Sequence, residues 1–189
     1  MEERKTIYLC LAHMSEKGIE QKYVKEAFDT NWVVSLGPNV NAFEGELEKF
    51  VNHNGVEHKV VALSAGTAAL HLALKACGVG QGDEVCVQSF TFCASSHPIT
   101  YLGATPVFID SERETWNMDP KLLEKAIIDR KEKTGKYPKA IVPVALYGMP
   151  YDCDRIMAIA NKYGIPVVED AAEGLGSRFD GKVLGTFGK

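Results

Sequence analysis

Three short segments of the sequence carry side chains that could hold a small, charged aromatic molecule. The first, Ser64-Ala-Gly-Thr67-Ala68, places small residues and hydroxyl groups directly before an apolar helical pattern. Such a segment presents free backbone N–H groups at a helix N-terminus, which is a natural phosphate site. An ordinary helix cap would use the same residue types, so this motif alone leaves both interpretations open.

The other two segments supply aromatic and acidic side chains. Gln88-Ser-Phe-Thr-Phe92 could offer a ring face to a flat heterocycle, or its two rings could belong to the core. Glu169-Asp-Ala-Ala-Glu173 ends an apolar run with adjacent acids, which are costly to bury unless they are paired. Asp170 could therefore keep a ring nitrogen protonated, or it could cap a helix that follows.

Each segment follows a predicted strand, and ligands of open parallel sheets bind beyond the carboxyl ends of the strands. Together the segments would supply a phosphate cradle, a stacking surface and a carboxylate for a pyridinium ring. Pyridoxal phosphate needs these three features, since its ring nitrogen requires an acidic partner if the ring is to act as an electron sink. The residues therefore predict a pyridoxal phosphate site.

Competing motifs find little support in the sequence. Gly78-Val-Gly80-Gln-Gly82 lacks the spacing of a dinucleotide site, and Gly188-Lys189 has no glycine five residues before Gly188, as a phosphate loop requires. No Gly-x-Ser-x-Gly elbow of a serine hydrolase is present. The histidines and cysteines show no metal-ligand spacing, so we expect no metal site.

Strand and helix patterns alternate along most of the chain. Strands are predicted over 59–63, 84–87, 106–109, 140–146 and 165–168, and helices over 17–30, 41–52, 68–77, 93–102, from 120 onward and around 156–163. Asp119 and Pro120 predict an N-cap and an N1 proline for the helix from 120 onward, and the Asp-Gly pair at 180–181 predicts a hairpin turn. In the helix over 41–52, the spacing of Phe43, Leu47 and Phe50 predicts a buried stripe. The alternation predicts an α/β fold with a mostly parallel sheet.

Composition limits the class of protein. The chain has 189 residues, 46% of them hydrophobic and 24% charged, which is typical of a soluble globular domain. Its net charge of −4 argues against a nucleic-acid partner, and no apolar run approaches the roughly 20 residues of a membrane span. The apolar run over 7–12 is too short for a secretory signal. Five scattered cysteines favour reduced thiols in a cytoplasmic protein.

Six motifs, in order along almost the whole chain, give it a specific resemblance. They are Leu36-Gly-Pro-Asn-Val-Asn-Ala-Phe-Glu44, Leu63-Ser-Ala-Gly-Thr-Ala-Ala-Leu70, Ser89-Phe-Thr-Phe92, Leu102-Gly-Ala-Thr-Pro-Val107, Val167-Val-Glu-Asp-Ala-Ala172 and Gly185-Thr-Phe-Gly188. In these motifs the chain resembles the DegT/DnrJ/EryC1/StrS aminotransferases, which are sugar aminotransferases of fold type I. One such motif would support the resemblance only weakly, but six motifs in the family's order support it strongly.

The resemblance assigns roles at the predicted cofactor site. It implies that Gly66, Thr67 and Ala68 hold the cofactor phosphate, by hydroxyl and backbone N–H groups. It implies that Phe92 stacks on the pyridine ring and that Asp170 pairs with the ring nitrogen.

Other positions match less closely. Glu173 falls where many members carry His or Gln near the ring, and it is taken as a further cofactor-binding residue. Gly37 and Asn39 match a loop near the active site, which could serve the partner subunit. Ala145 departs from the family, because many members have His there.

The resemblance also implies a domain plan. Residues 41–189 would form part of a three-layer α/β/α large domain, preceded by an N-terminal arm and helix over 1–40 and truncated before a smaller C-terminal domain. The lysine that forms the Schiff base would lie beyond Gly185-Thr-Phe-Gly188, in a stretch that the chain does not reach. Lys189 is too close to Gly188 to match it, so we expect the 189-residue chain alone to be inactive.

As a function, the resemblance implies transfer of an amino group, from glutamate as donor, to a nucleotide-linked keto sugar. The product would serve cell-surface polysaccharide or amino-sugar synthesis, and the enzyme would be a cytoplasmic homodimer. One alternative is a sugar dehydratase of the same family, in which His replaces the lysine. Others are a non-catalytic cofactor-binding fragment and an NAD-dependent oxidoreductase, although the sequence lacks the dinucleotide fingerprint of the latter.

Overall fold

The computed structural model describes residues 14–52 and 56–188. The chain divides into two compact units, residues 1–47 and 48–189. The first unit carries the helix α1 (Ile19–Asp29), and the helix α2 begins in it (Pro38–Val51). Ahead of α1, the Ser15 hydroxyl donates to the Glu20 carboxylate over 2.6 Å, and its oxygen accepts the Ile19 N–H over 3.1 Å. These local bonds fix the start of the helix.

The predicted buried stripe on the second helix is wrong. Neither α1 nor α2 has a buried residue, and Phe43 and Phe50 remain 55% and 40% exposed. The apolar spacing is that of a helix, and a helix forms over these residues. Burial also requires a surface that covers the stripe, and spacing alone does not supply one.

The second unit is built on a parallel sheet. Its strands lie in the order β2 (Thr105–Ile109), β1 (Glu84–Gln88) and β3 (Ala140–Val142). Beyond β3, the chain over 165–170 continues the parallel pairing through isolated bridges, Ile141 with Val167 and Val144 with Asp170. All these segments therefore end at the same edge of the sheet.

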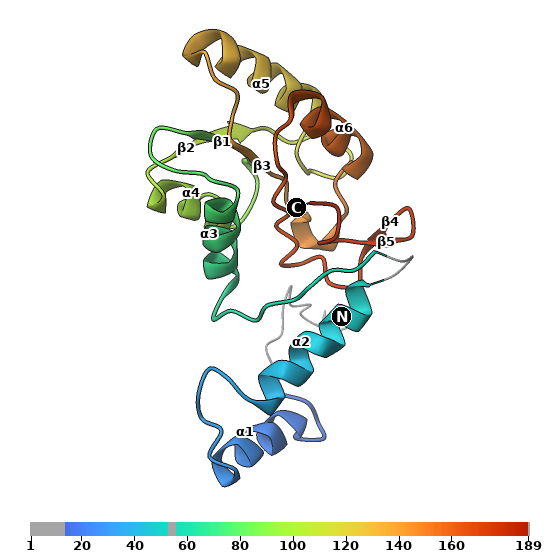
Figure 1. Ribbon diagram of the computed structural model, residues 1–189. Helices are drawn as coiled ribbons and strands as arrows, with labels where there is room; N and C mark the ends of the chain where they lie inside the picture. Colours follow the sequence, from blue (N-terminus) through green and yellow to red (C-terminus); the bar gives the residue numbers. More distant parts are fainter. Residues whose placement is uncertain (1–13, 53–55, 189) are drawn as a thin grey trace, which may run out of the picture. The chain divides into compact units, whose positions relative to one another are not determined.

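Helices cover both faces of this sheet (Figure 1). The helices α3 (Gly66–Ala76) and α4 (His97–Tyr101) cover one face, where Leu74 and Ile99 pack in a cluster with Val85 and Val87. Because strand side chains alternate, Cys86 between those valines points to the other face.

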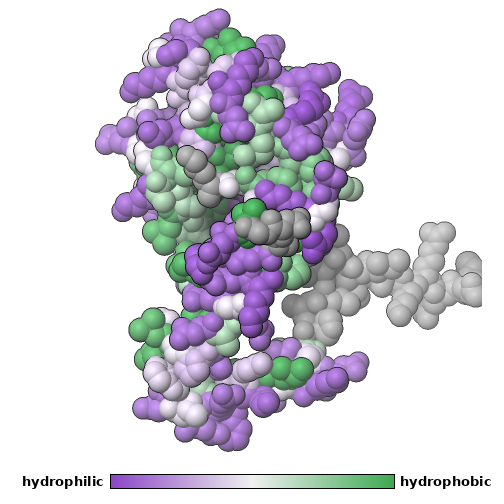
Figure 2. All heavy atoms as spheres, turned by 45° about the vertical axis from the view of Figure 1, so that its right-hand side comes forward, coloured by the Kyte–Doolittle hydropathy of each residue, from purple (hydrophilic) through white to green (hydrophobic). Residues whose placement is uncertain are grey.

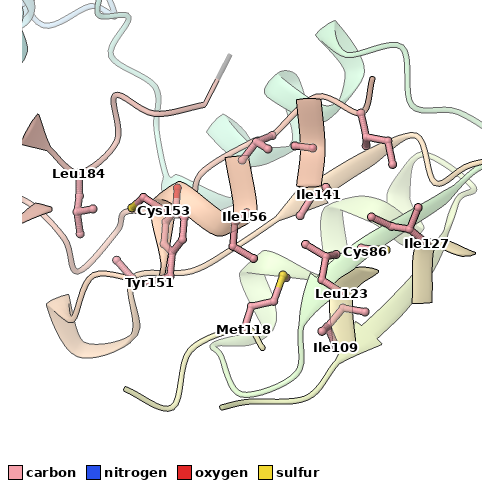
Figure 3. Packing of buried hydrophobic residues seen from close by; sticks show 14 residues of the cluster. Cys86, Ile109, Met118, Leu123, Ile127, Ile141, Tyr151, Cys153, Ile156 and Leu184 are labelled. Carbon is pink, nitrogen blue, oxygen red and sulfur yellow. The ribbon is translucent and has the colours of Figure 1, made fainter. Parts of the chain in front are cut away.

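The opposite face carries α5 (Pro120–Thr134) and α6 (Cys153–Tyr163). Figure 3 shows Leu123 and Ile127 of α5 and Ile156 of α6 gathered with Cys86 and Ile141 of the sheet. Two separate cores on either side of one sheet make the three-layer α/β arrangement, and the predicted fold class is confirmed.

Local signals located several elements correctly. The Asp119 side chain accepts the N–H groups of Lys121 and Leu122 at the start of α5, as a cap before an N1 proline should. The strands β4 (Arg178–Phe179) and β5 (Lys182–Val183) pair antiparallel around Asp180 and Gly181, whose φ angles are 46° and 75°. Positive φ at both central residues is what an Asp-Gly hairpin turn requires.

Four predicted elements differ from the structure. The strand predicted over 165–168 is reduced to an isolated bridge at Val167. Residues 59–63 do not form a strand, and Val61 is 74% exposed. The predicted helix over 93–102 is divided into the short 3-10 turn η1 (Cys93–Ser95) and α4, since Pro98 has no N–H to continue a helix through it. The strand predicted over 140–146 ends at Val142, and the 3-10 turn η2 (Leu146–Gly148) follows.

The cysteine side chains differ in accessibility. Cys86 and Cys153 are buried and Cys93 is exposed, whereas Cys10 lies outside the described residues. Burial raises the pKa of the Cys86 thiol to about 12, and burial together with nearby carboxylates does the same for Cys153. A protonated thiol is a poor nucleophile.

We expect iodoacetamide at pH 8 to alkylate Cys93 in the folded protein long before Cys86 or Cys153. Peptide mass spectrometry after timed quenching measures the three rates. Unfolding in urea should make them similar, because the buried thiols then regain ordinary pKa values. Fast labelling of Cys86 without urea would contradict the packing between the sheet and α5.

Candidate functional site

A cavity of about 430 Å³ lies at the carboxyl edge of the sheet. Three segments line it, each following a strand or a paired stretch of the sheet. They are 90–92 after β1, residues 144, 146 and 147 after β3, and residues 170, 172 and 173 after the stretch that pairs with β3. The cavity therefore lies at the edge of the sheet where ligands of open parallel sheets bind, and residues from two of the three predicted segments line it.

Asp170 presents a buried carboxylate to this cavity. Its Oδ2 atom accepts a hydrogen bond from the Ser95 hydroxyl over 2.5 Å, and the Ser95 oxygen lies 2.8 Å from the Thr91 hydroxyl. The Asp170 backbone N–H donates to the Pro143 carbonyl, and its carbonyl accepts the Ala145 N–H. The edge of the sheet thus holds the backbone of Asp170, and Ser95 of η1 holds its carboxylate.

The alternative role of Asp170 as a helix cap fits the structure poorly. Its Oδ1 atom accepts the Ala172 N–H at 3.3 Å, but the residues that follow form turns rather than a helix. A single long bond within a turn does not explain why a carboxylate is buried at this position.

Phe92 is not a core residue. The residue is 77% exposed and lines the cavity. Phe90, two residues earlier, also lines the cavity and packs edge-on against Trp116, with ring centroids 6.2 Å apart. The prediction of a free aromatic face at this point is consistent with the exposure of Phe92.

The predicted phosphate cradle lies at the N-terminus of α3. Ala65 is the N-cap there, with extended backbone and no side-chain cap bond, so neither Ser64 nor Thr67 caps the helix. The N–H groups of the first turn have no intrahelical acceptor and can bind an anion. Gly66, Thr67 and Ala68 do not line the cavity itself, but α3 contacts η1, the turn directly after Phe92.

Glu173 lines the cavity and also binds Tyr147, another residue of the cavity lining. Its Oε2 atom accepts the Tyr147 N–H over 2.6 Å. Tyr147 has a φ angle of 51°, a left-handed conformation that costs a bulky residue on the order of 1 kcal/mol. A Cβ at the next residue, Gly148, would lie 2.9 Å from the Glu173 carbonyl oxygen, so only glycine fits.

Two other positions singled out by the resemblance are also described. Ala145 is buried, and its N–H donates to the Asp170 carbonyl. Gly37, next to the start of α2 in the first unit, has a φ angle of 133°, and a Cβ there would lie 2.9 Å from the Trp32 ring. Asn39 lies in α2, and Lys189 lies outside the described residues.

Sequence reasoning assigned no role to Glu169, which anchors a second loop. Its Oε1 atom accepts the N–H groups of Phe187 and Gly188 over 2.5 and 2.8 Å, and its Oε2 atom accepts the Gly185 N–H over 3.1 Å. Burial, and then the Glu169 carboxylate, raise the pKa of the nearby Tyr151 hydroxyl well above its usual value, so Tyr151 stays neutral. Figure 3 shows the Tyr151 ring directed toward Cys153, inside the core.

Two buried amides, Gln88 and Asn117, were also missed. Gln88 ends β1 and Asn117 precedes α5. The sequence did carry a signal for Gln88, because it is a polar residue at the end of an apolar strand. The interpretation of that segment rested instead on the aromatic residues that follow it. Among the described residues, no cluster of three or more His, Cys, Asp or Glu side chains could hold a metal ion. No helix in residues 14–52 or 56–188 is long and apolar enough to span a membrane.

Known proteins resemble this chain closely. The sequence pattern of the DegT/DnrJ/EryC1/StrS aminotransferase family matches residues 14–189. EpsN of Bacillus subtilis (strain 168) is 50% identical over 185 residues, which are 98% of this chain and 46% of EpsN. GDP-perosamine synthase of Escherichia coli O157:H7 is 41% identical over 181 residues, which are 96% of this chain and 47% of that enzyme. The chain spans about half the length of these relatives.

Solved structures are also similar to this chain. A DegT DnrJ EryC1 StrS aminotransferase from Brucella abortus superposes with a TM-score of 0.79 at 36% identity, over 93% of this chain and 48% of that one. NtdA of Bacillus subtilis, solved with its cofactor PMP, gives a TM-score of 0.75 at 32% identity, over 86% of this chain and 35% of that one. At 32–36% identity, the chain is similar to these proteins in sequence as well as in fold.

We expect Glu169→Gln to lower the free energy of unfolding by about 1–3 kcal/mol, because the charged acceptor of three N–H groups becomes a neutral amide. Urea denaturation followed by circular dichroism measures the change. Glu124→Gln is the control, since Glu124 forms an exposed pair with Lys162 and should matter little. Equal effects of the two substitutions would contradict an anchoring role for Glu169.

Proposed function

We propose that this chain, which belongs to the DegT/DnrJ/EryC1/StrS aminotransferase family, binds pyridoxal phosphate and serves the transfer of an amino group to a nucleotide-linked keto sugar. One observation carries the proposal. Phe92, Asp170 and Glu173 come from separate parts of the sequence and line a single cavity. The name of GDP-perosamine synthase, a relative that is 41% identical, supports a nucleotide-linked sugar as the substrate class.

The residues that line the cavity, together with those at the N-terminus of α3, which contacts η1, fit this cofactor. Asp170 offers a buried carboxylate for the ring nitrogen, and Phe92 offers an exposed ring face. Thr67 and the N–H groups of the first turn of α3 offer hydrogen bonds to a phosphate. When bound, pyridoxal phosphate supplies an electron sink for the negative charge that develops on the substrate carbon.

Asp170 acts through its charge. A carboxylate beside the ring nitrogen keeps that nitrogen protonated, because the ion pair favours the charged form of both groups. Ser95 assists by donating to Oδ2, which fixes the direction of the carboxylate. Phe92 would offer its ring face to the cofactor ring and exclude water from that side.

The wider assignments follow from the family. We propose glutamate as the amino donor and cell-surface polysaccharide or amino-sugar synthesis as the use of the product. We place the protein in the cytoplasm, and the five scattered cysteines of the sequence support this placement. We place an N-terminal arm over 1–40 ahead of a cofactor-binding domain over 41–189, and the change of compact unit after residue 47 supports a boundary in this region.

We expect Asp170→Asn to lower kcat by about two orders of magnitude or more, since a neutral amide cannot keep the ring nitrogen protonated. The assay requires the full-length protein, meaning this chain continued by the second half that its relatives have. It measures amino-sugar formation from glutamate and a nucleotide-linked keto sugar, at saturating cofactor.

Asp119→Asn is the matched control. Asp119 caps α5, and Asn caps a helix about as well as Asp does, so this variant should keep its activity. If Asp170→Asn also kept near-normal activity, Asp170 would be a structural acceptor and the proposed ion pair would be wrong. Loss of the fold is checked by comparing the circular dichroism spectra of the variants.

We also propose that the full-length protein is a homodimer. Large apolar side chains of α1, of the connector and of α2 are exposed, and they include Tyr23, Val24, Phe28, Trp32, Val34, Leu36 and Phe43. Figure 2 shows hydrophobic side chains at the surface in both parts of the chain. Large apolar side chains exposed in this number over a short part of the chain support an interaction site there.

The double substitution Val24→Glu with Phe28→Glu should convert the full-length dimer to a monomer, because it places two charges on an apolar helix face. Multi-angle light scattering measures the mass. Lys22→Glu, a charge change at a polar position of α1, should leave the dimer intact. An unaltered protein that is monomeric and still turns over substrate would contradict the proposal.

A further inference from the structure

The two buried amides, Gln88 and Asn117, bind backbone groups of two segments that line the cavity. We call residues 90–92 the first wall and residues 144–147 the second wall. Both amide side chains are wholly buried. Burying an amide costs free energy unless its donors and acceptors are satisfied. The partners of these two amides therefore indicate what they are for.

Gln88 binds the first wall. Its Nε2 group donates to the carbonyl of Phe90 over 2.9 Å, within the loop that carries Phe92. Its Oε1 atom accepts the N–H of Met118 over 2.8 Å. The end of β1 is thus tied both to the aromatic loop and to the segment before α5.

Asn117 binds the second wall. Its Oδ1 atom accepts the N–H of Leu146 over 3.0 Å, and its Nδ2 group donates to the carbonyl of Met149 over 2.9 Å. These bonds hold both ends of η2, the turn that presents Tyr147 to Glu173. The two amides also contact each other, with Gln88 Nε2 donating to Asn117 Oδ1 over 3.4 Å.

Phe90 and Leu146 both line the cavity, one on each wall. The chain of bonds from the Phe90 carbonyl through Gln88 and Asn117 to the Leu146 N–H is therefore a direct polar link between the walls. We call this pair of side chains the amide bridge. An amide suits the position, because it donates and accepts at once, whereas a carboxylate could not donate and an ammonium could not accept.

We propose that the amide bridge sets the separation of the two cavity walls and so positions Phe92 and η2 for the cofactor ring. Gln88 and Asn117 are positioning residues, since they act through backbone groups and do not line the cavity. The proposal rests on the proposed function for the identity of the ligand. The coupling of the two walls does not depend on that identity.

The test of the first part is a double-mutant cycle on cofactor affinity. Asn117→Leu and Gln88→Met keep the volume of the side chains and remove their hydrogen bonds. Each single variant of the full-length protein should weaken pyridoxal phosphate binding by about tenfold, and the double variant should be little worse than either. Equilibrium titration, followed by quenching of protein fluorescence, measures the dissociation constants.

Two controls separate positioning from loss of stability. Ser177→Ala removes a 2.7 Å bond from the Ser177 hydroxyl to the Gly148 carbonyl, which holds η2 without linking it to the other wall. Ile127→Val loosens the core beside α5, on the face of the sheet that packs against α5 and α6. Both should lower the melting temperature and change cofactor affinity less than twofold. If they weaken binding as much as Asn117→Leu does, the bridge is merely structural.

A second readout needs no cofactor. In Asn117→Leu, hydrogen–deuterium exchange should rise together in the amides of residues 89–92 and 146–149, because the two walls lose their link. A rise confined to 146–149 would overturn the proposal. If Asn117→Leu does not fold, Gln88→Met, which leaves both Asn117 bonds to η2 in place, gives the same test from the other wall. The two proposals can fail separately. If the unaltered protein did not bind pyridoxal phosphate, but exchange still rose in both walls of the variant, the proposed function would be wrong and the amide bridge would stand.

Discussion

The parallel pairing of β1 with both of its neighbours is the constraint on which the rest of the structure depends. Val87 pairs with Phe108 on one side and with Val142 on the other. The three parallel strands therefore end at the same edge of the sheet. Loops that are 29 residues apart in sequence, such as those of Gln88 and Asn117, therefore become neighbours. A cavity forms at this edge because the strands end there and the loops diverge toward helices on opposite faces.

The same geometry gives two adjacent acids different tasks. Successive side chains of an extended chain point to opposite sides, so Glu169 and Asp170 cannot serve one site. Glu169 turns to the N–H groups of 185–188, and Asp170 turns to the cavity and Ser95. The bond between Ser95 and Asp170 joins residues 75 positions apart, and it connects the loop after β1 with the chain beyond β3. This contact therefore stabilises the fold and also positions a side chain of the site.

Sequence reasoning succeeded where local chemistry decides the structure. The Asp119 cap with its N1 proline, the Asp180-Gly181 turn and the α/β alternation all depend on neighbouring residues. It failed where an outcome needs a distant partner, as for the strand expected over 59–63, which has no paired strand within the described residues. The burial expected on α2 failed for the same reason. The amide bridge could not be predicted either, because nothing near Asn117 in the sequence marks its bond to Leu146.

The resemblance placed Glu173 where relatives carry His or Gln, and the structure gives a physical reason why all three residues are compatible there. The bond from the Tyr147 N–H requires only an acceptor, which a carboxylate, an amide oxygen or a neutral imidazole nitrogen can supply. What Glu changes is charge, since it adds a second carboxylate to a cavity that Asp170 already makes acidic. Two carboxylates on one small cavity favour a bound cation over a neutral ring. Glu at this position therefore keeps the bond to the backbone of η2 and, if the proposed cofactor binds here, would favour a protonated ring nitrogen.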